Sequence, residues 1–403
     1  MSDLDHKATP WDVVVVGGGP AGLAAALALR ITGASVLVLE RRQPPLDKTC
    51  GEGLMPDAVA SLRALGVNTS EIPAHSFTGI RYLDGELEAA ADFPRGVGLG
   101  VRRLELSQAL LSAAHGAGVE LRFGARVEGL LPPEPDAAGK SRWPGLLTAE
   151  GEIRASLLVA ADGLRSPLRH AAGLASDSSP LRRFGMRRHF RIQPWSPRVD
   201  VHWGQDCEAY VTPVAEDEVG VAFLWSGFKA TFEELLQGFP RLEQRLAGQT
   251  PSSQTAGCGP LAQGVRKPWR RNLALIGDAS GYVDAITGEG LAMTFAQAEA
   301  LGQCFEGTRW PSAASGSSSH SSFTSSLARY GRRHRAIGRL PNAMTRGILA
   351  LERRPELRRR VLTALHRDPD LFQRLLGIHA RTLPVHRLGW KGVYRLARSV
   401  VYH

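Results

Sequence analysis

The 403-residue sequence lacks several features that define common protein classes. It has only four cysteines, which form neither a CxxC pair nor a cluster with histidine: Cys50, Cys207, Cys258 and Cys304. This spacing argues against a zinc or iron–sulfur centre, so we expect reduced thiols and no metal site. No apolar run reaches about eighteen residues, and no apolar signal segment precedes Pro10. The sequence therefore predicts a cytoplasmic protein without a transmembrane helix.

Acidic residues are scarce in the C-terminal part of the chain. Residues 327–403 hold eighteen Lys and Arg against four Asp and Glu, a net charge of +14, whereas the whole chain carries +10. A recognisable nucleic-acid-binding motif is also lacking, so nucleic acid is not an expected partner. The simplest interpretation is a solvated, arginine-rich helical segment. The alternatives are peripheral contact with a membrane surface or with an acidic protein.

The length predicts about two or three domains. A buried strand at residues 12–16, a helix at 23–32 and a second strand at 34–39 form a βαβ pattern. Further buried strands at 157–161 and 273–276 enclose a β-rich stretch between residues 184 and 225. The domain built from these strands is therefore expected to be discontinuous, with a β-rich sheet inserted into it.

The predicted division of this α/β chain gives four parts. The Rossmann-like cofactor domain takes residues 9–75, 98–178 and 265–305, and the β-rich substrate domain takes 76–97 and 179–264. A Ser-rich loop at 306–326 and a basic helical segment at 327–403 follow, the latter broken at Pro341, Pro355, Pro369 and Pro384.

A glycine-rich turn lies between the first strand and the first helix. Gly17, Gly19 and Gly22 fit the GxGxxG pattern, with Pro20 and Ala21 inside it. These glycines permit a tight turn, close approach of a pyrophosphate and close helix–strand packing, while the helix N-terminus stabilises phosphate charge. Glu40, which Arg41 follows, ends the second strand at the distance expected for binding ribose hydroxyls. The turn predicts a bound dinucleotide.

A second segment distinguishes FAD from NAD. Gly277-Asp278 resembles the segment of FAD oxidoreductases whose aspartate holds the ribityl chain. It is followed by Gly288, Glu289, Gly290 and Leu291 at the start of a helix. Backbone N–H groups at such a helix N-terminus can stabilise the negative charge of the reduced flavin N1/C2=O edge.

A third segment, Asp162-Gly163, resembles the Asp-Gly motif of single-component aromatic hydroxylases, in which it contacts FAD and is tied to reduced pyridine nucleotide. Arg103 matches the FAD-binding arginine of that family. The sequence from residue 11 to about 304 thus resembles flavin monooxygenases of the para-hydroxybenzoate hydroxylase type. The resemblance implies a discontinuous GR2-type FAD-binding domain with FAD as the cofactor. No second GxGxxG is found, so NAD(P)H is expected to act as a transient reductant.

Within that superfamily, Cys50-Gly-Glu52-Gly and the Thr-Gly-Glu289-Gly segment are most similar to the geranylgeranyl reductase branch, whose matching cysteine lies near the flavin. Cys50 either tunes the flavin pocket or is a small packed residue. Glu52 either donates a proton or orients substrate, or caps the glycine-rich loop. The reductases' Tyr-x-Trp-x-Phe-Pro motif is reduced here to Tyr210 and Pro213.

The substrate is expected to be a small apolar or aromatic molecule. Tyr210, Trp203 and His189 lie in the predicted substrate sheet and are candidate pocket residues, with core packing as the alternative. The hypothesis favoured by sequence is an NAD(P)H-dependent monooxygenase that hydroxylates or epoxidises through a flavin C4a-hydroperoxide. The first alternative is reduction of an isoprenoid or other alkene. The second is a flavoprotein that acts on a protein partner.

Overall fold

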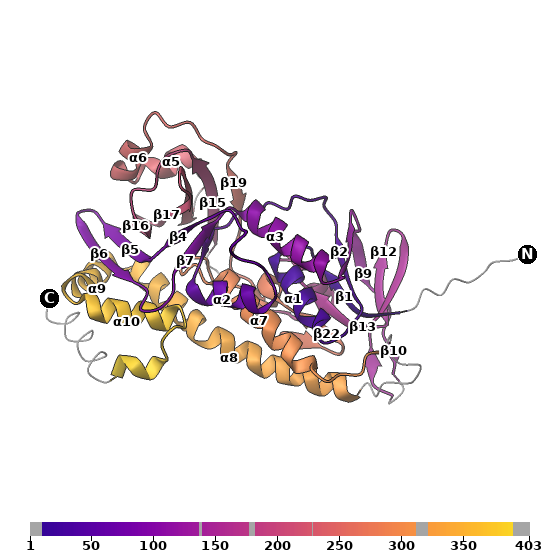
Figure 1. Cartoon of the computed structure of the whole chain (residues 1–403). Helices are drawn as coiled ribbons and strands as arrows, with labels where there is room; N and C mark the ends of the chain where they lie inside the picture. The colour runs from indigo at the N-terminus through magenta and orange to yellow at the C-terminus, as the bar shows by residue number, and fades with distance from the viewer. Residues whose placement is uncertain (1–9, 137–138, 177–181, 228, 312–320, 390–403) are drawn as a thin grey trace, which may run out of the picture.

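A computed structural model describes residues 10–136, 139–176, 182–227, 229–311 and 321–389. Two large sheets dominate it, and a row of C-terminal helices runs beneath both (Figure 1). The first sheet has eight strands, six of them in the order β21-β22-β13-β1-β2-β8, with β9 and β12 paired beyond β13. Its strands are β1 Trp11–Val16, β2 Val36–Glu40, β8 Glu120–Phe123, β9 Val127–Leu130, β12 Gly145–Thr148, β13 Gly151–Ala160, β21 Trp269–Arg270 and β22 Leu273–Leu275.

Strand β1 lies at the centre of this sheet and pairs in parallel with β13 and β2. Val13, Val14 and Val15 are fully buried, because helices or strands cover both faces of the strand. The uninterrupted valine run in the sequence therefore reports burial on both sides. Strand β22 follows β1 by more than 250 residues in the chain, yet it belongs to the same sheet and pairs in parallel with β13. The sheet is therefore assembled from distant segments.

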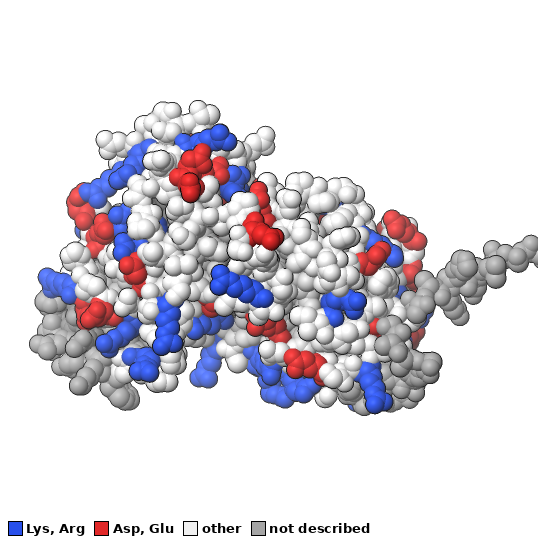
Figure 2. All heavy atoms as spheres, viewed as in Figure 1, with Lys and Arg blue, Asp and Glu red and all other residues white. Residues whose placement is uncertain are grey.

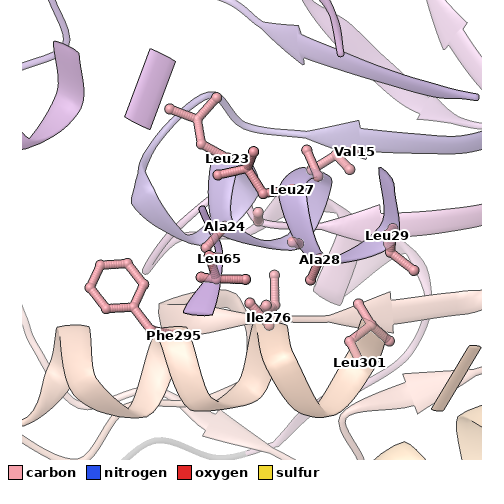
Figure 3. Packing of buried hydrophobic residues seen from close by; sticks show 14 of the residues in the cluster. Val15, Leu23, Ala24, Leu27, Ala28, Leu29, Leu65, Ile276, Phe295 and Leu301 are labelled. Atoms are coloured by element: carbon pink, nitrogen blue, oxygen red, sulfur yellow. The ribbon is translucent and has the colours of Figure 1, made fainter. Parts of the chain in front are cut away.

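Two helices hold these segments together on one face of the first sheet. Helix α1 (Pro20–Arg30) packs against α7 (Gly290–Phe305), and their apolar side chains interdigitate around Ile276 (Figure 3). A Cβ atom on Gly302 would lie 2.7 Å from the carbonyl oxygen of Ala28, so only glycine permits this close approach. The remaining helices of the first half of the chain are α2 Pro56–Ala64, α3 Arg103–Gly116 and α4 Pro167–Ala171.

The second sheet has seven strands in the order β19-β15-β18-β17-β16-β5-β6. They are β5 Gly79–Asp84, β6 Leu87–Asp92, β15 Arg183–Phe190, β16 Arg198–Trp203, β17 Cys207–Ala215, β18 Glu218–Ser226 and β19 Ala256–Cys258. A three-stranded sheet, β3 Gly53–Leu54, β7 Gly98–Val101 and β4 Ala74–Phe77, lies between the two large sheets. Short pairs complete the strands: β10 Glu134–Pro135 with β11 Ser141–Arg142, and β14 Ala175–Ser176 with β20 Gly264–Val265.

The sequence of residues 231–246 is typical of one helix, but the structure shows that this prediction is wrong. The segment is divided into α5 (Phe232–Gln237) and α6 (Pro240–Leu246). Pro240 has no backbone N–H and cannot continue α5, but it fits the first turn of a new helix. Both helices cover one face of the second sheet, where Phe223 packs against Phe232 and Phe239.

The C-terminal segment is helical as expected, but two of its predicted boundaries are wrong. Helix α8 (Ser321–Glu352) runs through Pro341 and begins inside the segment predicted as a Ser-rich loop, of which residues 312–320 lie outside the described residues. The helix is held by tertiary contacts on both sides of the proline: Leu327 and Tyr330 pack in the α1–α7 core, and the Thr345 hydroxyl lies 3.0 Å from that of Thr287. The breaks at Pro355 and Pro369 are confirmed, since α9 (Pro355–Arg367) and α10 (Pro369–His379) begin there.

The α/β fold with C-terminal helices agrees with the expectation from sequence, whereas the domain boundaries stay predictions. Two 3-10 turns complete the elements, η1 Gly277–Ser280 and η3 Val385–Leu388. In the described part of the chain, no helix combines the length and apolar character needed to cross a membrane.

Substitution of Gly302 by alanine tests the α1–α7 contact. Helix propensity alone would make Gly302→Ala stabilising by about 1 kcal/mol. The contact with the Ala28 carbonyl reverses the sign, and we expect the free energy of unfolding to fall by about 1–3 kcal/mol in chemical denaturation. Gly116→Ala, at the end of α3 with open space around it, is the matched control and should be neutral or stabilising. Equal effects of the two substitutions would contradict the close packing.

Candidate active site

The turn between β1 and α1 leaves one side open for a ligand. Gly17 has φ +110°, and a Cβ there would lie 2.4 Å from the carbonyl oxygen of Ala161, while a Cβ on Gly22 would lie 1.8 Å from that of Gly17. A Cβ on Gly19 would meet only the Arg103 guanidinium, 4.0 Å away. Gly19 caps α1 without a side-chain hydrogen bond, so the first N–H groups of the helix face this open side. The turn can therefore hold a pyrophosphate.

Glu40 lies at the end of β2 beside this turn. Its Oε2 accepts a hydrogen bond from the Gly18 N–H (2.8 Å), and its Oε1 accepts one from the Arg42 N–H (3.0 Å). The carboxylate is therefore fixed in orientation before any ribose binds. The neighbouring Arg41 is exposed.

Arg103 begins α3 and is buried, with its guanidinium near Gly19. Its Nε is buried and has no hydrogen-bond partner among the described residues. A buried guanidinium with an unused donor, facing a phosphate-binding turn, fits an anionic ligand group.

The Asp162-Gly163 turn follows β13. Oδ2 of Asp162 accepts from the Leu168 N–H (3.2 Å), whereas Oδ1 is buried without a partner in the described part of the chain. Burial raises the pKa of this carboxyl. Gly163 has φ +83° and completes the turn. These unused polar atoms, together with the Gly19 opening and Arg103, fit FAD.

Arg169 was not singled out by sequence reasoning, yet it joins two of the expected cofactor segments. Its side chain is buried and donates to the carbonyl oxygens of Asp278 (3.3 Å), Ala279 (3.2 Å) and Leu164 (2.7 Å). It therefore ties the turn after β13 to the turn after β22. No local sequence pattern marks such a contact across 109 residues.

Asp278 lies in η1 and faces the loop after β2. Lys48 Nζ donates to its Oδ2 at 2.6 Å, and both side chains are partly exposed. Gly277 has φ +60°, and its N–H donates to Gln297 of α7 (2.8 Å). The expected ribityl-binding aspartate is thus accessible and close to a lysine that sequence reasoning missed.

The N-terminus of α7 contacts the C-terminal helices. Gly288 has φ +68°, Glu289 is the residue before the helix, and Gly290 and Leu291 open it. Glu289 is buried, and its Oε1 lies 3.6 Å from Nδ1 of His379, the last residue of α10. Nε2 of His379 lies 3.1 Å from the carbonyl oxygen of Thr287. The C-terminal segment thus reaches the expected flavin-binding loop, which no sequence signal indicated.

Burial favours the neutral form of both side chains in this pair. It raises the pKa of Glu289 to about 8 and lowers that of His379 to about 4. Asp57 and Arg381 also face the pair, with Arg381 Nε 2.8 Å from Asp57 Oδ2, and Tyr82 lies close to Glu289. At neutral pH Glu289 is therefore a protonated carboxylic acid beside the α7 N-terminus.

Glu52 fixes the loop that carries Cys50. Its backbone has φ +60°, and its buried carboxylate accepts from the Arg103 N–H (2.8 Å) and from Nε2 of His189 (2.5 Å). Ser253 lies 2.7 Å from the other ring nitrogen of His189, whose side chain is completely buried. His189, a candidate substrate residue by sequence, is placed behind the loop, where it supports Glu52.

The Cys50 thiol is partly exposed and faces the Glu52 backbone, whose N–H donates to Sγ (3.3 Å). Burial raises the pKa of this thiol against the opposing effect of Arg103. Thr212 donates to the carbonyl oxygen of Gly51 (2.8 Å) and fastens the loop to β17. Cys50 is thus a protonated thiol on a rigid loop.

Tyr210 and Trp203 have different surroundings in the second sheet. The Tyr210 hydroxyl donates to the carbonyl oxygen of Ile286 (2.7 Å), next to the loop before α7, and burial raises its pKa well above its usual value. The Trp203 ring is buried between Tyr82 and the guanidinium of Arg358, which lies 5.2 Å from the ring centroid. Tyr210 therefore borders the expected flavin loop, whereas Trp203 packs beneath α9.

A buried ionic cluster at Arg183 was not expected from sequence. The Arg183 guanidinium contacts carboxylates of Glu208 (2.6 Å), Asp284 (3.0 Å) and Glu352 (2.5 Å). Burial raises the pKa of Glu208 to about 8 despite this guanidinium. The cluster joins the second sheet, the segment before the flavin loop and the end of α8.

Comparison with known proteins identifies the class. Residues 10–221 match the family described as FAD binding domain, and the chain belongs to this family. It is therefore an FAD-dependent oxidoreductase, as the sequence predicted.

Two curated relatives are reductases. The chain is 30% identical over 305 residues to menaquinone reductase of Mycobacterium tuberculosis, covering 70% of this chain and 72% of the relative. It is 29% identical over 302 residues to digeranylgeranylglycerophospholipid reductase 1 of Methanopyrus kandleri, covering 70% and 76%. A flavoprotein/dehydrogenase structure from Cytophaga hutchinsonii aligns with a TM-score of 0.73 at 18% identity over 93% of this chain and 94% of that one, which confirms the fold.

Replacement of Asp278 tests the ribityl assignment. We expect Asp278→Ala to purify colourless, because the aspartate is the accessible acceptor in this segment. The measurement is the ratio of flavin to protein absorbance. Asp217→Ala, on the exposed turn between β17 and β18, is the control and should keep its FAD. Full occupancy in Asp278→Ala would refute the assignment.

Replacement of Glu289 tests its protonation. A carboxyl with a folded-state pKa of about 8 keeps its proton where the unfolded chain has lost it, so stability falls as pH rises toward 8. The lowered pKa of His379 makes stability rise with pH instead, but only below about pH 6.5, where the unfolded histidine is protonated. Between pH 6.5 and 8 we expect the wild type to lose about 2 kcal/mol of unfolding free energy relative to Glu289→Gln. Glu243→Gln, exposed on α6, should follow the wild type, and identical pH profiles for all three would contradict the buried acid.

Proposed function

We propose that this flavoprotein reduces a carbon–carbon double bond of an isoprenoid chain, with NAD(P)H as the transient reductant of FAD. The observation that carries the proposal is the Cys50 thiol, which keeps its proton beside Arg103 on a fixed loop. Lys48 of the same loop binds Asp278 of the expected flavin-binding segment. Two reductases that share about 30% identity with the chain support it, and one of them is named for a digeranylgeranyl lipid. This assignment replaces the monooxygenase favoured by sequence with its first alternative.

Reduction of an alkene needs one hydride and one proton. When bound, reduced FAD supplies the hydride. Cys50 supplies the proton: its S–H bond breaks as a C–H bond forms at the second alkene carbon, and water then returns a proton to the thiolate. The positive charge of Arg103 stabilises the thiolate that remains and so lowers the free energy needed to release the proton. The low reactivity of a thiol with a raised pKa keeps the proton in place until substrate is bound.

Glu52 acts as a positioning residue in this proposal. Both of its oxygens are engaged by Arg103 and His189, so its carboxylate orients the loop and leaves proton donation to Cys50. Tyr210 borders the loop before α7 through its hydrogen bond to Ile286. Glu208 occupies the place of the first aromatic residue of the reductase motif and contacts Arg183, so this part of the second sheet is built differently from that motif.

A monooxygenase remains the second candidate, because one observation favours it. The Asp162-Gly163 turn, which resembles the hydroxylase motif, keeps a buried carboxylate oxygen without a partner in the described part of the chain. The two reactions differ in product mass. The enzyme is reduced anaerobically with NAD(P)H and mixed with a polyprenyl substrate, with and without oxygen. A product heavier by two hydrogens without oxygen supports the reductase, and one heavier by an oxygen atom, formed only with oxygen, overturns it.

Replacement of Cys50 tests the proton donor. We expect Cys50→Ala to slow flavin reoxidation by the alkene by about 10²-fold or more, because general acid catalysis is lost. Reoxidation by oxygen, which yields hydrogen peroxide, takes its proton from water and should be unchanged. Cys304→Ser, at the buried end of α7, is the control. An unchanged alkene rate in Cys50→Ala would remove the thiol from the mechanism.

A further inference from the structure

Five arginines form a straight stripe along α8. Arg332, Arg339, Arg346 and Arg353 recur every seven residues, and Arg335 lies one turn from the first. Seven residues make almost two turns of an α-helix, so these side chains share one face, with Arg353 one residue past the helix end. All five are exposed. At 1.5 Å per residue, this arginine stripe is about 30 Å long.

The stripe carries charge of one sign. Its guanidinium groups make no hydrogen bond or ion pair with another described residue, unlike Arg358, which pairs with Asp84. Glu352 is the only acidic residue between 321 and 352, and it is buried against Arg183. Basic side chains project below the molecule along the path of α8 (Figure 2). The stripe therefore presents unneutralised positive charge.

Small residues separate the arginines. Ala336, Ala343, Gly347 and Ala350 are exposed beside the stripe, and the other exposed residue between Arg332 and Arg353 is Arg333, which binds Gln303 of α7. They offer neither aromatic rings for stacking on bases nor side-chain donors and acceptors for reading a particular partner. Evenly spaced arginines without other contact groups suit a flat surface with mobile negative charges, because such charges can move to meet each guanidinium.

A cavity of about 350 Å³ opens at the C-terminal end of the stripe. Arg346 and Arg353 lie at it, and Leu349, Tyr282 and Val283 contribute apolar lining. The Tyr282 ring lies about 3.4 Å from the position of a Cβ on Gly290, the first residue of α7. The cavity thus lies between the arginine stripe and the expected flavin loop.

We propose that the arginine stripe docks the protein on a bilayer containing anionic lipid headgroups. The choice of a lipid surface rests on the proposed function, because an isoprenoid substrate is dissolved in a bilayer, and the cavity would receive its chain from that side. Each arginine near an anionic surface strengthens partition by about five-fold, so that several together suffice for peripheral binding. The stripe would then bind the headgroups on the same face on which the cavity opens.

Cosedimentation with vesicles tests the docking. The holoenzyme should bind vesicles of phosphatidylcholine with phosphatidylglycerol, bind phosphatidylcholine alone weakly, and be released by salt. The triple variant Arg332→Gln, Arg335→Gln, Arg339→Gln should lose about 100-fold in partition. A matched triple at exposed arginines outside α8, Arg95→Gln, Arg126→Gln and Arg191→Gln, removes the same charge and should bind like the wild type.

Several results would overturn the proposal. They are equal binding by both triple variants, equal binding to vesicles with and without phosphatidylglycerol, and binding of a DNA duplex in the absence of vesicle binding. Reduction of a short, water-soluble isoprenoid separates docking from catalysis. The stripe variant should keep that activity, and vesicle binding without any alkene reduction would reject the proposed function while leaving the docking intact.

Discussion

One buried carboxylate holds the candidate active site together. Glu52 adopts a backbone conformation that is costly for a residue other than glycine, and its hydrogen bonds to Arg103 and His189 hold it there. Arg103 starts α3 beside the phosphate-binding turn, and His189 belongs to β15 of the second sheet. The loop with Cys50 is therefore fixed relative to both sheets, and removing this carboxylate would leave buried polar groups unpaired on each side.

The C-terminal helices are part of the site, although they lie beyond the residues that match the FAD-binding family. Glu352 closes the Arg183 cluster, and His379 contacts the loop before α7. Both contacts are buried, so they depend on tight packing of α8 and α10 against the segment around Asp284 and Thr287. Relatives that share the first 300 residues can thus differ in the chemistry of this loop through their C-terminal helices alone.

The sequence predicted features that depend on local backbone geometry. The strands β1, β2 and β22 were placed to within about two residues, because short apolar runs ended by glycine have few other solutions. The end of β13 was predicted equally well, but the strand begins six residues earlier than expected, at Gly151, because its first half is polar and partly exposed. The missed residues act over long distances: Lys48 bonds Asp278 across 230 positions and Arg169 bonds it across 109. The residues next to a charged side chain in the sequence do not indicate which distant residue it will bind. Pro240 is a sequence signal for the start of a helix, and it was missed. The continuation of α8 through Pro341 could not be predicted from sequence, because it depends on tertiary packing.

The discontinuous first sheet has a consequence for synthesis of the chain. Helix α1 leaves the ribosome early, but α7, which covers its apolar side, is complete only at Phe305. Until then Ala24 and Ala28 have no cover on the side that α7 later occupies (Figure 3), and β13 has no β22 as its parallel neighbour. The nascent protein therefore exposes the apolar side of α1 during most of its translation. Exposed apolar surface of this kind is prone to aggregation and is what general chaperones bind.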